Sequence, residues 1–271
     1  NFSDAKPVAQ PLRQTFSLTV YNGNPAGAEH IVSTLLQAYC REHMELFIVR
    51  RNFNSIYADG SDLLKQLQAQ TNFTLFEQDK ETGLQELFER LMAIMGERMQ
   101  LRNEFVQQNG LTRGDPQNTV RAFEYIHAHS TPLMVIFENY YEFAKSLYDG
   151  QAVMFAELFR AQDPNTTSKK NNGYGYNIYY TACFGPGEYT LTAAQTPMAD
   201  CFNPQKFTLM FGGQLDKCGA VPLPRDYLAI NEPDEHYNHC VMYYQGRLAG
   251  LSLPCGELVH VEPDPDEVPI I

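Results

Sequence analysis

The stretch YNIYYTAC at residues 176–183 begins a series of short runs in which β-branched and aromatic residues dominate. Such residues favour strands, and Gly and Pro separate the runs at intervals typical of a small antiparallel sheet. The later runs are EYTLTA at 188–193, KFTLMF at 206–211, DYLAI at 226–230, CVMYYQ at 240–245 and LVHVE at 258–262. The sequence therefore predicts a β-rich region over residues 176–271, which ends in an acidic, Pro-rich tail.

Residues 165–175, which read NTTSKKNNGYG, are polar and show no apolar periodicity. A segment of this composition offers little apolar surface for packing, so we predict an exposed loop or linker there. It divides the chain into two regions, 1–164 and 176–271.

The region 1–164 has mainly helical patterns after one strand predicted at 15–21. Apolar residues recur at three- and four-residue steps over 31–48 and, most clearly, over 83–108, and Asp115-Pro116 is typical of a helix start. Residues 133–159 are predicted to form one or two further helices. The predicted fold class is α+β, a helical N-terminal region followed by a disulfide-linked antiparallel β-rich region.

The charge of the chain excludes some partners. Its formal net charge is −12 and no basic tail or stripe is present, so we expect no binding to nucleic acid. The longest apolar runs, such as PLMVIF at 132–137, are too short to span a bilayer, and we expect no membrane insertion.

The cysteines and the first residue favour a secreted or extracellular protein. The cysteine positions lack the closely paired spacing of structural zinc sites, which favours a disulfide framework in an oxidising compartment. The cysteines are Cys40, Cys183, Cys201, Cys218, Cys240 and Cys255, and a bridge between the last two would close a hairpin. Asn1 is compatible with removal of a signal peptide, and the sequons at Asn72 and Asn165 are compatible with glycosylation.

The stretch NEPDEHYNHC at residues 231–240 concentrates histidines and carboxylates. His236 and His239 could lie on one side of a turn and bind a metal ion together with Asp234 or Glu235. The alternative is a solvated loop that leads into a strand, with no metal bound. No P-loop and no GxSxG motif occur, and we expect no cofactor.

The tripeptide Glu232-Pro233-Asp234, followed by Cys240 and Cys255, resembles the C-terminal part of a C-type lectin-like domain. The resemblance implies a carbohydrate-binding hairpin. Leu248-Ala249-Gly250 stands roughly where that family carries a further calcium-ligand motif, so the implied carbohydrate binding is independent of calcium.

Tyrosines gather in the predicted β-rich region, and tyrosine is enriched at recognition surfaces as well as in strands. The residues are Tyr176, Tyr179, Tyr180, Tyr243 and Tyr244. The leading hypothesis is a secreted, non-enzymatic interaction protein that presents these tyrosines to a protein or glycan partner, with its oligomeric state open. The alternative is a secreted hydrolase or metal-dependent enzyme that uses His236 and His239.

Overall fold

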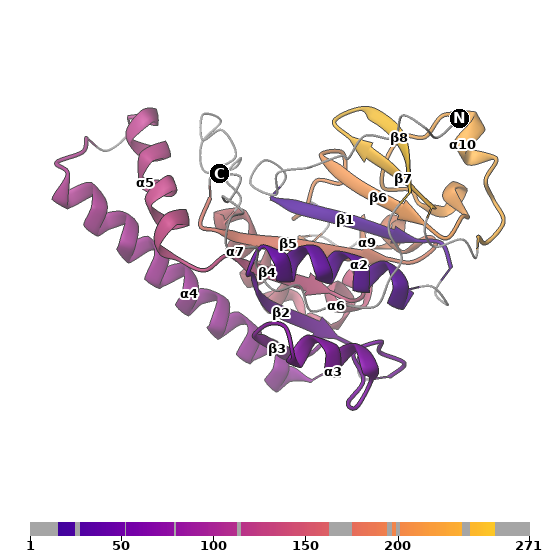
Figure 1. Ribbon diagram of the computed structural model, residues 1–271, viewed down its shortest axis with the longest axis horizontal. Coiled ribbons are helices and arrows are strands. Elements are labelled where there is room, and N and C mark those ends of the chain that lie inside the picture. The colour runs from indigo at the N-terminus through magenta and orange to yellow at the C-terminus, as the bar shows by residue number, and fades with distance from the viewer. Residues whose placement is uncertain are drawn as a thin grey trace.

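The computed structural model contains one eight-stranded sheet with the strand order β3-β2-β4-β5-β1-β6-β7-β8 (Figure 1). It describes residues 16–24, 28–51, 53–78, 80–112, 115–162, 175–193, 197–198, 201–234 and 239–252. The strands are β1 (Ser17–Asn22), β2 (Glu45–Arg50), β3 (Phe73–Glu77), β4 (Leu133–Phe137), β5 (Ile178–Phe184), β6 (Phe207–Phe211), β7 (His239–Tyr244) and β8 (Arg247–Ser252). In this spatial order, every neighbouring pair from β3 through β6 is parallel. The last two pairs, β6 with β7 and β7 with β8, are antiparallel.

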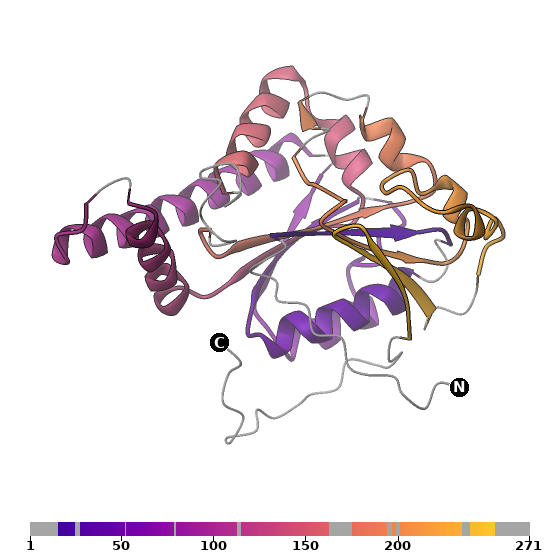
Figure 2. The same ribbon diagram turned by 90° about the horizontal axis from the view of Figure 1, so that it is seen from above.

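Helices cover both faces of the sheet, as in other doubly wound α/β folds (Figure 2). The helices are α2 (Ala28–Arg41), α3 (Asp62–Gln68), α4 (Glu81–Gln108), α5 (Pro116–His129), α6 (Tyr140–Ser146), α7 (Asp149–Gln162), α9 (Glu188–Ala193) and α10 (Arg225–Leu228), with the 3₁₀ turn η3 (Leu215–Lys217). Helices α2 and α3 pack on one face, and α4, α6 and α7 pack on the other.

An aromatic cluster fills the core between the sheet and α6 and α7. The Phe159 ring lies 5.0 Å from that of Tyr180 and 5.4 Å from that of Phe202, and the Phe143 and Phe155 rings are 5.4 Å apart. All five side chains are buried, so this cluster supplies much of the apolar area that joins helices to sheet.

Helices α4 and α5 extend together beyond the end of the sheet (Figure 1). Leu84, Leu87 and Leu91 of α4 are buried in the core, and Met95 and Leu101 farther along the helix pack against it as partly buried side chains. Where α4 leaves the body, the buried Arg98 donates hydrogen bonds to the carbonyls of Tyr176 at 2.6 Å and Thr131 at 2.7 Å. These two bonds join α4 to the segments that precede β5 and β4.

The predicted α+β class is wrong, because strands from both halves of the chain alternate in one mostly parallel sheet. The predicted helices over 31–48 and 133–159 contain the strands β2 and β4, and β3 was not predicted at all. Parallel strands are buried on both faces and therefore read as continuous apolar runs without alternation. The proposed linker at 165–175 lies outside the described residues, apart from Gly175.

Two predicted strands, 188–193 and 226–230, are wrong, because the chain forms α9 and α10 there. At α9 the Glu188 carboxylate accepts a hydrogen bond from the backbone N–H of Gly185, and the Thr192 hydroxyl donates to the Glu188 carbonyl at 2.9 Å. These local bonds outweigh the strand preference of Tyr and Thr. The predicted strands at 15–21, 176–183, 206–211 and 240–245 are confirmed with shifts of one or two residues, the helix at 83–108 is confirmed as α4, and 258–262 lies outside the described residues.

The predicted hairpin after residue 240 is present, but no disulfide closes it. β7 and β8 pair directly, with Cys240 opposite Leu251, and the turn is made by Gln245 and Gly246, both at positive φ. Two consecutive residues at positive φ are what a tight two-residue hairpin turn requires. Cys255 lies outside the described residues.

The predicted disulfide framework is wrong. Cys40, Cys183, Cys218 and Cys240 are free thiols. Cys201 also keeps its S–H, which donates to the carbonyl of Pro197 at 3.7 Å. The cysteines belong to different core clusters of the α/β fold, where a buried thiol packs as a small apolar side chain.

We therefore expect thiol titration in denaturant without reductant to detect at least five thiols per chain. In the folded protein at pH 8 most of them should react slowly, because burial raises the pKa of Cys183 and Cys240 to about 12 and that of Cys218 to about 11. The thiolate fraction is then on the order of a thousandth or less. Four thiols or fewer in denaturant would contradict the structure, since a single disulfide leaves four of the six cysteines.

Candidate functional site at the carboxyl edge of the parallel strands

The carboxyl ends of β1, β2, β4, β5 and β6 meet at one edge of the sheet, because these strands are parallel. The chain leaves β1 through α2 on one face of the sheet and leaves β5 through α9 on the other. In open α/β sheets, ligands bind outside the carboxyl ends of strands where the connections change face in this way. This edge is therefore the candidate site.

The start of the loop after β1 is packed against the loop after β6. The N–H of Gly23 donates to the Phe211 carbonyl at 2.8 Å, and its carbonyl accepts from Gln214 Nε2 at 2.7 Å. A Cβ atom placed on Gly23 would lie 2.0 Å from the Gly213 oxygen, so only glycine fits. The backbone groups of Gly23 are therefore committed to the protein itself.

The Glu138 carboxylate, directly after β4, binds the loop that follows β2. Its Oε2 accepts hydrogen bonds from the Arg51 N–H at 2.9 Å and the Ser55 hydroxyl at 2.7 Å, and its Oε1 accepts from the Ile56 N–H at 2.9 Å. Arg51 Nη2 lies 3.6 Å from Oε1, and the Glu138 side chain is only 4% exposed. Glu138 thus holds the β2–α3 loop over the end of β4.

The next residue, Asn139, forms a second link across the same edge. Its side-chain amide donates to both oxygens of Glu188, at 2.9 and 3.0 Å, and its own oxygen accepts from the Glu142 N–H at 2.9 Å. The Glu188 carboxylate in turn binds the Gly185 N–H. Asn139 therefore caps α6 and ties it to the start of α9.

Two buried tyrosines lie in the core cluster on the α2 side of the sheet, Tyr39 on α2 and Tyr57 in the loop between β2 and α3. Tyr39 and Tyr57 have exposed fractions of 3% and 0%, and the Tyr39 hydroxyl shares a 2.7 Å hydrogen bond with Thr181. Within the described residues the Tyr57 hydroxyl has no hydrogen-bond partner. Burial, and then the nearby Cys183 and Glu138, raise the pKa of Tyr57 well above its ordinary value. Both phenols therefore stay protonated at neutral pH.

Comparison with solved structures identifies this architecture, although no family model and no curated protein sequence matches the chain. The pCW3 conjugation coupling protein TcpA, solved as a monomer with ATPγS, has a TM-score of 0.55 and 11% identity. The cytoplasmic domain of the Thermomonospora curvata type VII secretion ATPase EccC has a TM-score of 0.57 and 12% identity. The alignments cover 90% and 93% of this chain, but only 61% and 25% of those proteins. The chain shares the fold of these two structures.

In P-loop ATPases the loop after the first strand carries the signature G-x-x-x-x-G-K-[ST], whose lysine reaches the phosphates. From Gly23, at the end of β1, this chain reads GNPAGAEH, and α2 begins at Ala28. Ala28, Glu29 and His30 therefore stand where the signature has Gly, Lys and Ser or Thr. The sequence of the loop after β1 therefore lacks the P-loop signature.

The predicted secreted interaction protein is wrong, and so are the extracellular and glycoprotein assignments. Their main support was the disulfide framework, which the free thiols remove, and the structural neighbours are ATPase domains, one of which is described as cytoplasmic. Asn72 is exposed just before β3, and Asn165 lies outside the described residues. None of the described helices is long and apolar enough to cross a membrane.

The structure describes only part of the predicted metal site. Asp234 lies beside the β6 loop, where its N–H donates to the Gly212 carbonyl at 2.9 Å and Pro233 forms a β-bridge with Gly213. His239 begins β7, and His236 and Glu235 lie outside the described residues. Among the described residues, no group of His, Cys, Asp or Glu could hold a metal ion.

The predicted binding tyrosines are mostly core residues. Tyr176, Tyr179, Tyr180 and Tyr243 have exposed fractions of 8%, 5%, 0% and 6%, and Tyr244 is partly buried. The five tyrosines pack in four different clusters, so they form no common surface.

The sequence analysis missed Glu138, Asn139 and Glu188, which organise the candidate site. The available signal was a pair of polar residues, Glu138-Asn139, directly after the apolar run LMVIF. In a parallel sheet such a position marks the carboxyl edge, but the run was read as part of a helix.

Proposed function

We propose that this chain is an ATPase-fold domain that does not hydrolyse ATP, and that it serves as a non-catalytic module of a larger transport ATPase. One observation carries the proposal: residues 22–40, which include the loop after β1 and nearly all of α2, contain no lysine or arginine. A triphosphate bound at this position would meet no cation from the segment that normally supplies one.

Electrostatics at the start of α2 support the proposal. The N-terminus of a helix attracts phosphate groups because unpaired N–H groups and the helix dipole favour negative charge. In this chain the second residue of α2 is the acidic Glu29. Its charge favours the helix itself and disfavours an approaching phosphate.

The state of Glu138 also supports the proposal. In P-loop ATPases an aspartate of the Walker B motif helps to hold Mg²⁺, with a Ser or Thr of the P-loop. Glu138 follows β4 at the same edge of the sheet, but its two oxygens are bound to Arg51, Ser55 and Ile56. The carboxylate has a structural role in this chain and is closed to a metal ion.

The neighbours suggest the context in which such a domain works. One is a conjugation coupling protein and the other a type VII secretion ATPase, and this chain spans only part of each. A domain that keeps the fold and lacks the phosphate ligands can still pack against neighbouring domains. By analogy with the EccC domain, the proposed location is the cytoplasmic side of a membrane-associated machine.

Isothermal calorimetry with MgATP tests the loss of nucleotide binding. We expect no saturable heat up to about 1 mM ATP, the upper end of the usual affinity range for nucleotide substrates. An intact P-loop ATPase in the same buffer is the positive control. Saturable binding with a dissociation constant below about 100 µM, equivalent to roughly −5.5 kcal/mol, would refute the proposal.

A further inference from the structure

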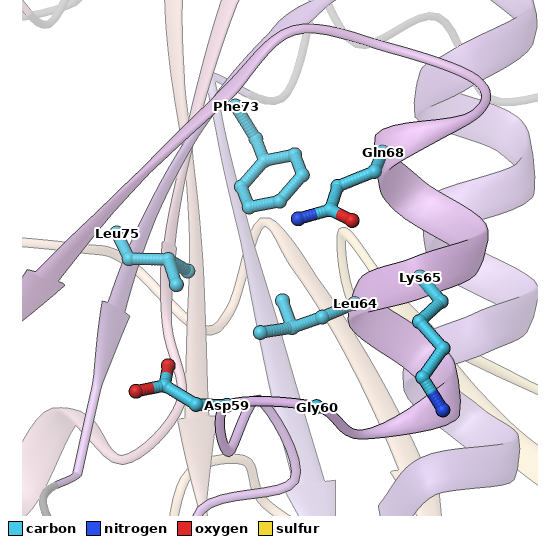
Figure 3. A pocket seen from close by; sticks show the side chains of 7 residues that line it. All are labelled: Asp59, Gly60, Leu64, Lys65, Gln68, Phe73 and Leu75. Atoms are coloured by element: carbon cyan, nitrogen blue, oxygen red, sulfur yellow. The ribbon is translucent and has the colours of Figure 1, made fainter.

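A groove lies at the β3 end of the sheet, between α3 and β3 (Figure 3). Its volume is about 250 Å³, and its lining residues are Asp59, Gly60, Leu64, Lys65, Gln68, Phe73 and Leu75. Leu64 and Gln68 point across the groove toward the side chains of Leu75 and Phe73, whereas Lys65 points away (Figure 3). The groove therefore has an apolar floor and one open side.

β3 is the last strand of the sheet, and within the described residues no strand pairs with its outer edge. The Asn72 carbonyl accepts a hydrogen bond from the Leu46 N–H at 3.1 Å, and the Gln78 N–H donates to the Arg50 carbonyl at 3.1 Å. The backbone N–H and C=O groups of the even-numbered residues of β3 therefore face β2. Backbone groups alternate in direction along a strand, so those of Phe73 and Leu75 face outward. The outer edge thus offers unused donors and acceptors beside the apolar groove.

Beside Phe73 and Leu75 this edge has none of the features that usually prevent strand addition, whereas at its carboxyl end Gly83 of α4 packs against the backbone of Glu77. Exposed edges are commonly blocked by lysine, by proline, by a bulge or by a covering segment. β3 reads FTLFE, without lysine or proline, and its register with β2 is continuous. Phe73 and Leu75 are only partly buried, because α3 leaves them open toward the edge.

The charges around the groove are paired with one another. Arg50 binds Asp59 at 2.7 Å, Lys65 binds Asp62 at 2.8 Å, and Lys80 binds Glu77. The described rim therefore has no excess charge of either sign to attract a charged ligand. An acidic segment, such as this chain's own 262–267, would find no unpaired cation there.

We propose that this groove binds an uncharged, extended peptide segment of another protein, which adds to β3 as a ninth strand. Backbone hydrogen bonds to Phe73 and Leu75 would hold the segment, and apolar side chains at alternate positions would cover Leu64, Phe73 and Leu75. The proposal does not depend on the state of the nucleotide position, since β2, β4 and β5 separate β3 from β1 in the sheet.

Selection of random dodecapeptides displayed on phage, with the immobilised full chain as target, tests the proposal. Selected peptides are then synthesised with a fluorescent label and their affinities are measured by anisotropy. We expect the selection to return uncharged peptides with apolar residues at positions i and i+2. Their affinity for the Leu75→Lys variant of this chain should be at least tenfold lower than for the unchanged chain. Proline at a position that must donate to β3 should abolish binding.

The control is Gln107→Lys, which adds the same charge at an exposed position near the end of α4 and should change affinity less than twofold. If Leu75→Lys does not fold, Gln68→Trp fills the groove from an exposed position on α3 and should give the same loss of affinity.

The proposal is overturned if the groove variants weaken the binding of no selected peptide, or if the peptides whose binding they weaken are bound as helices. It is also overturned if sedimentation shows a dimer of this chain that Leu75→Lys dissociates, because the occupant would then be a second copy.

Discussion

Replacing Glu138 by alanine should lower the free energy of unfolding by about 4 kcal/mol, since each buried donor left without an acceptor costs roughly 1–3 kcal/mol. The substitution removes the acceptor of the Arg51 and Ile56 N–H groups and of the Ser55 hydroxyl, at a side chain that is 4% exposed. Urea unfolding followed by circular dichroism measures the change. The melting temperature should fall by roughly 10 °C.

Glu142→Ala is the matched control for this prediction. Glu142 lies four residues away, is 39% exposed and pairs with Lys145 at 3.7 Å. An exposed ion pair of this kind contributes less than about 1 kcal/mol. If the two alanine variants had equal stability, the β2–α3 loop would not be held by Glu138.

A second large effect is expected at Gly213, where the β6 loop meets both the β1 loop and residues 232–234. Gly213 has φ +72°, and a Cβ atom there would lie 2.1 Å from the Glu232 carbonyl oxygen and 2.9 Å from the Asp234 nitrogen. Gly213→Ala must therefore displace backbone. We expect a loss of at least about 3 kcal/mol of unfolding free energy, from conformational strain together with this clash.

The variant Gly246→Ala separates the cost of the positive φ angle from the cost of a steric clash at Cβ. Gly246 has φ +84° in the β7–β8 turn, and a Cβ atom there would meet nothing within 4 Å. This variant should lose only the conformational part, about 1 kcal/mol. Equal losses for the two variants, measured in the same unfolding experiment, would show that the β6 loop is not packed as described.

The sequence pattern was sufficient to predict those helices and strands that are defined by their own residues alone. The apolar face of α4 and the Asp115-Pro116 start of α5 are both properties of one segment. The pairing of β1 with β5 and β6 is different, because these strands are separated by more than a hundred residues. No local pattern records such pairing, and a long crossover through helices is needed to make it parallel.

The buried strands were read as helices for a related reason. The sequences ELFIVR and LMVIF are apolar on both sides, since helices cover both faces of the sheet. Such runs do not alternate, and their spacing matches a helix equally well. The cysteines were misread because spacing alone does not distinguish a disulfide from a buried thiol in a core.

The candidate site could be predicted only in part. The absence of a P-loop is visible in the sequence, but it bears on the proposed function only once the parallel sheet and the place of β1 in it are known. The roles of Glu138 and Asn139 depend on partners in other segments, at Ser55 and Glu188, which only the folded chain brings close.

Release of inorganic phosphate from MgATP by the purified chain tests the central claim most directly, that the fold is retained without ATP hydrolysis. At about 1 mM ATP, where an ordinary ATPase would be close to saturation, the account predicts no release above the rate in buffer alone. Sustained phosphate release that copurifies with the chain at constant specific activity would contradict it.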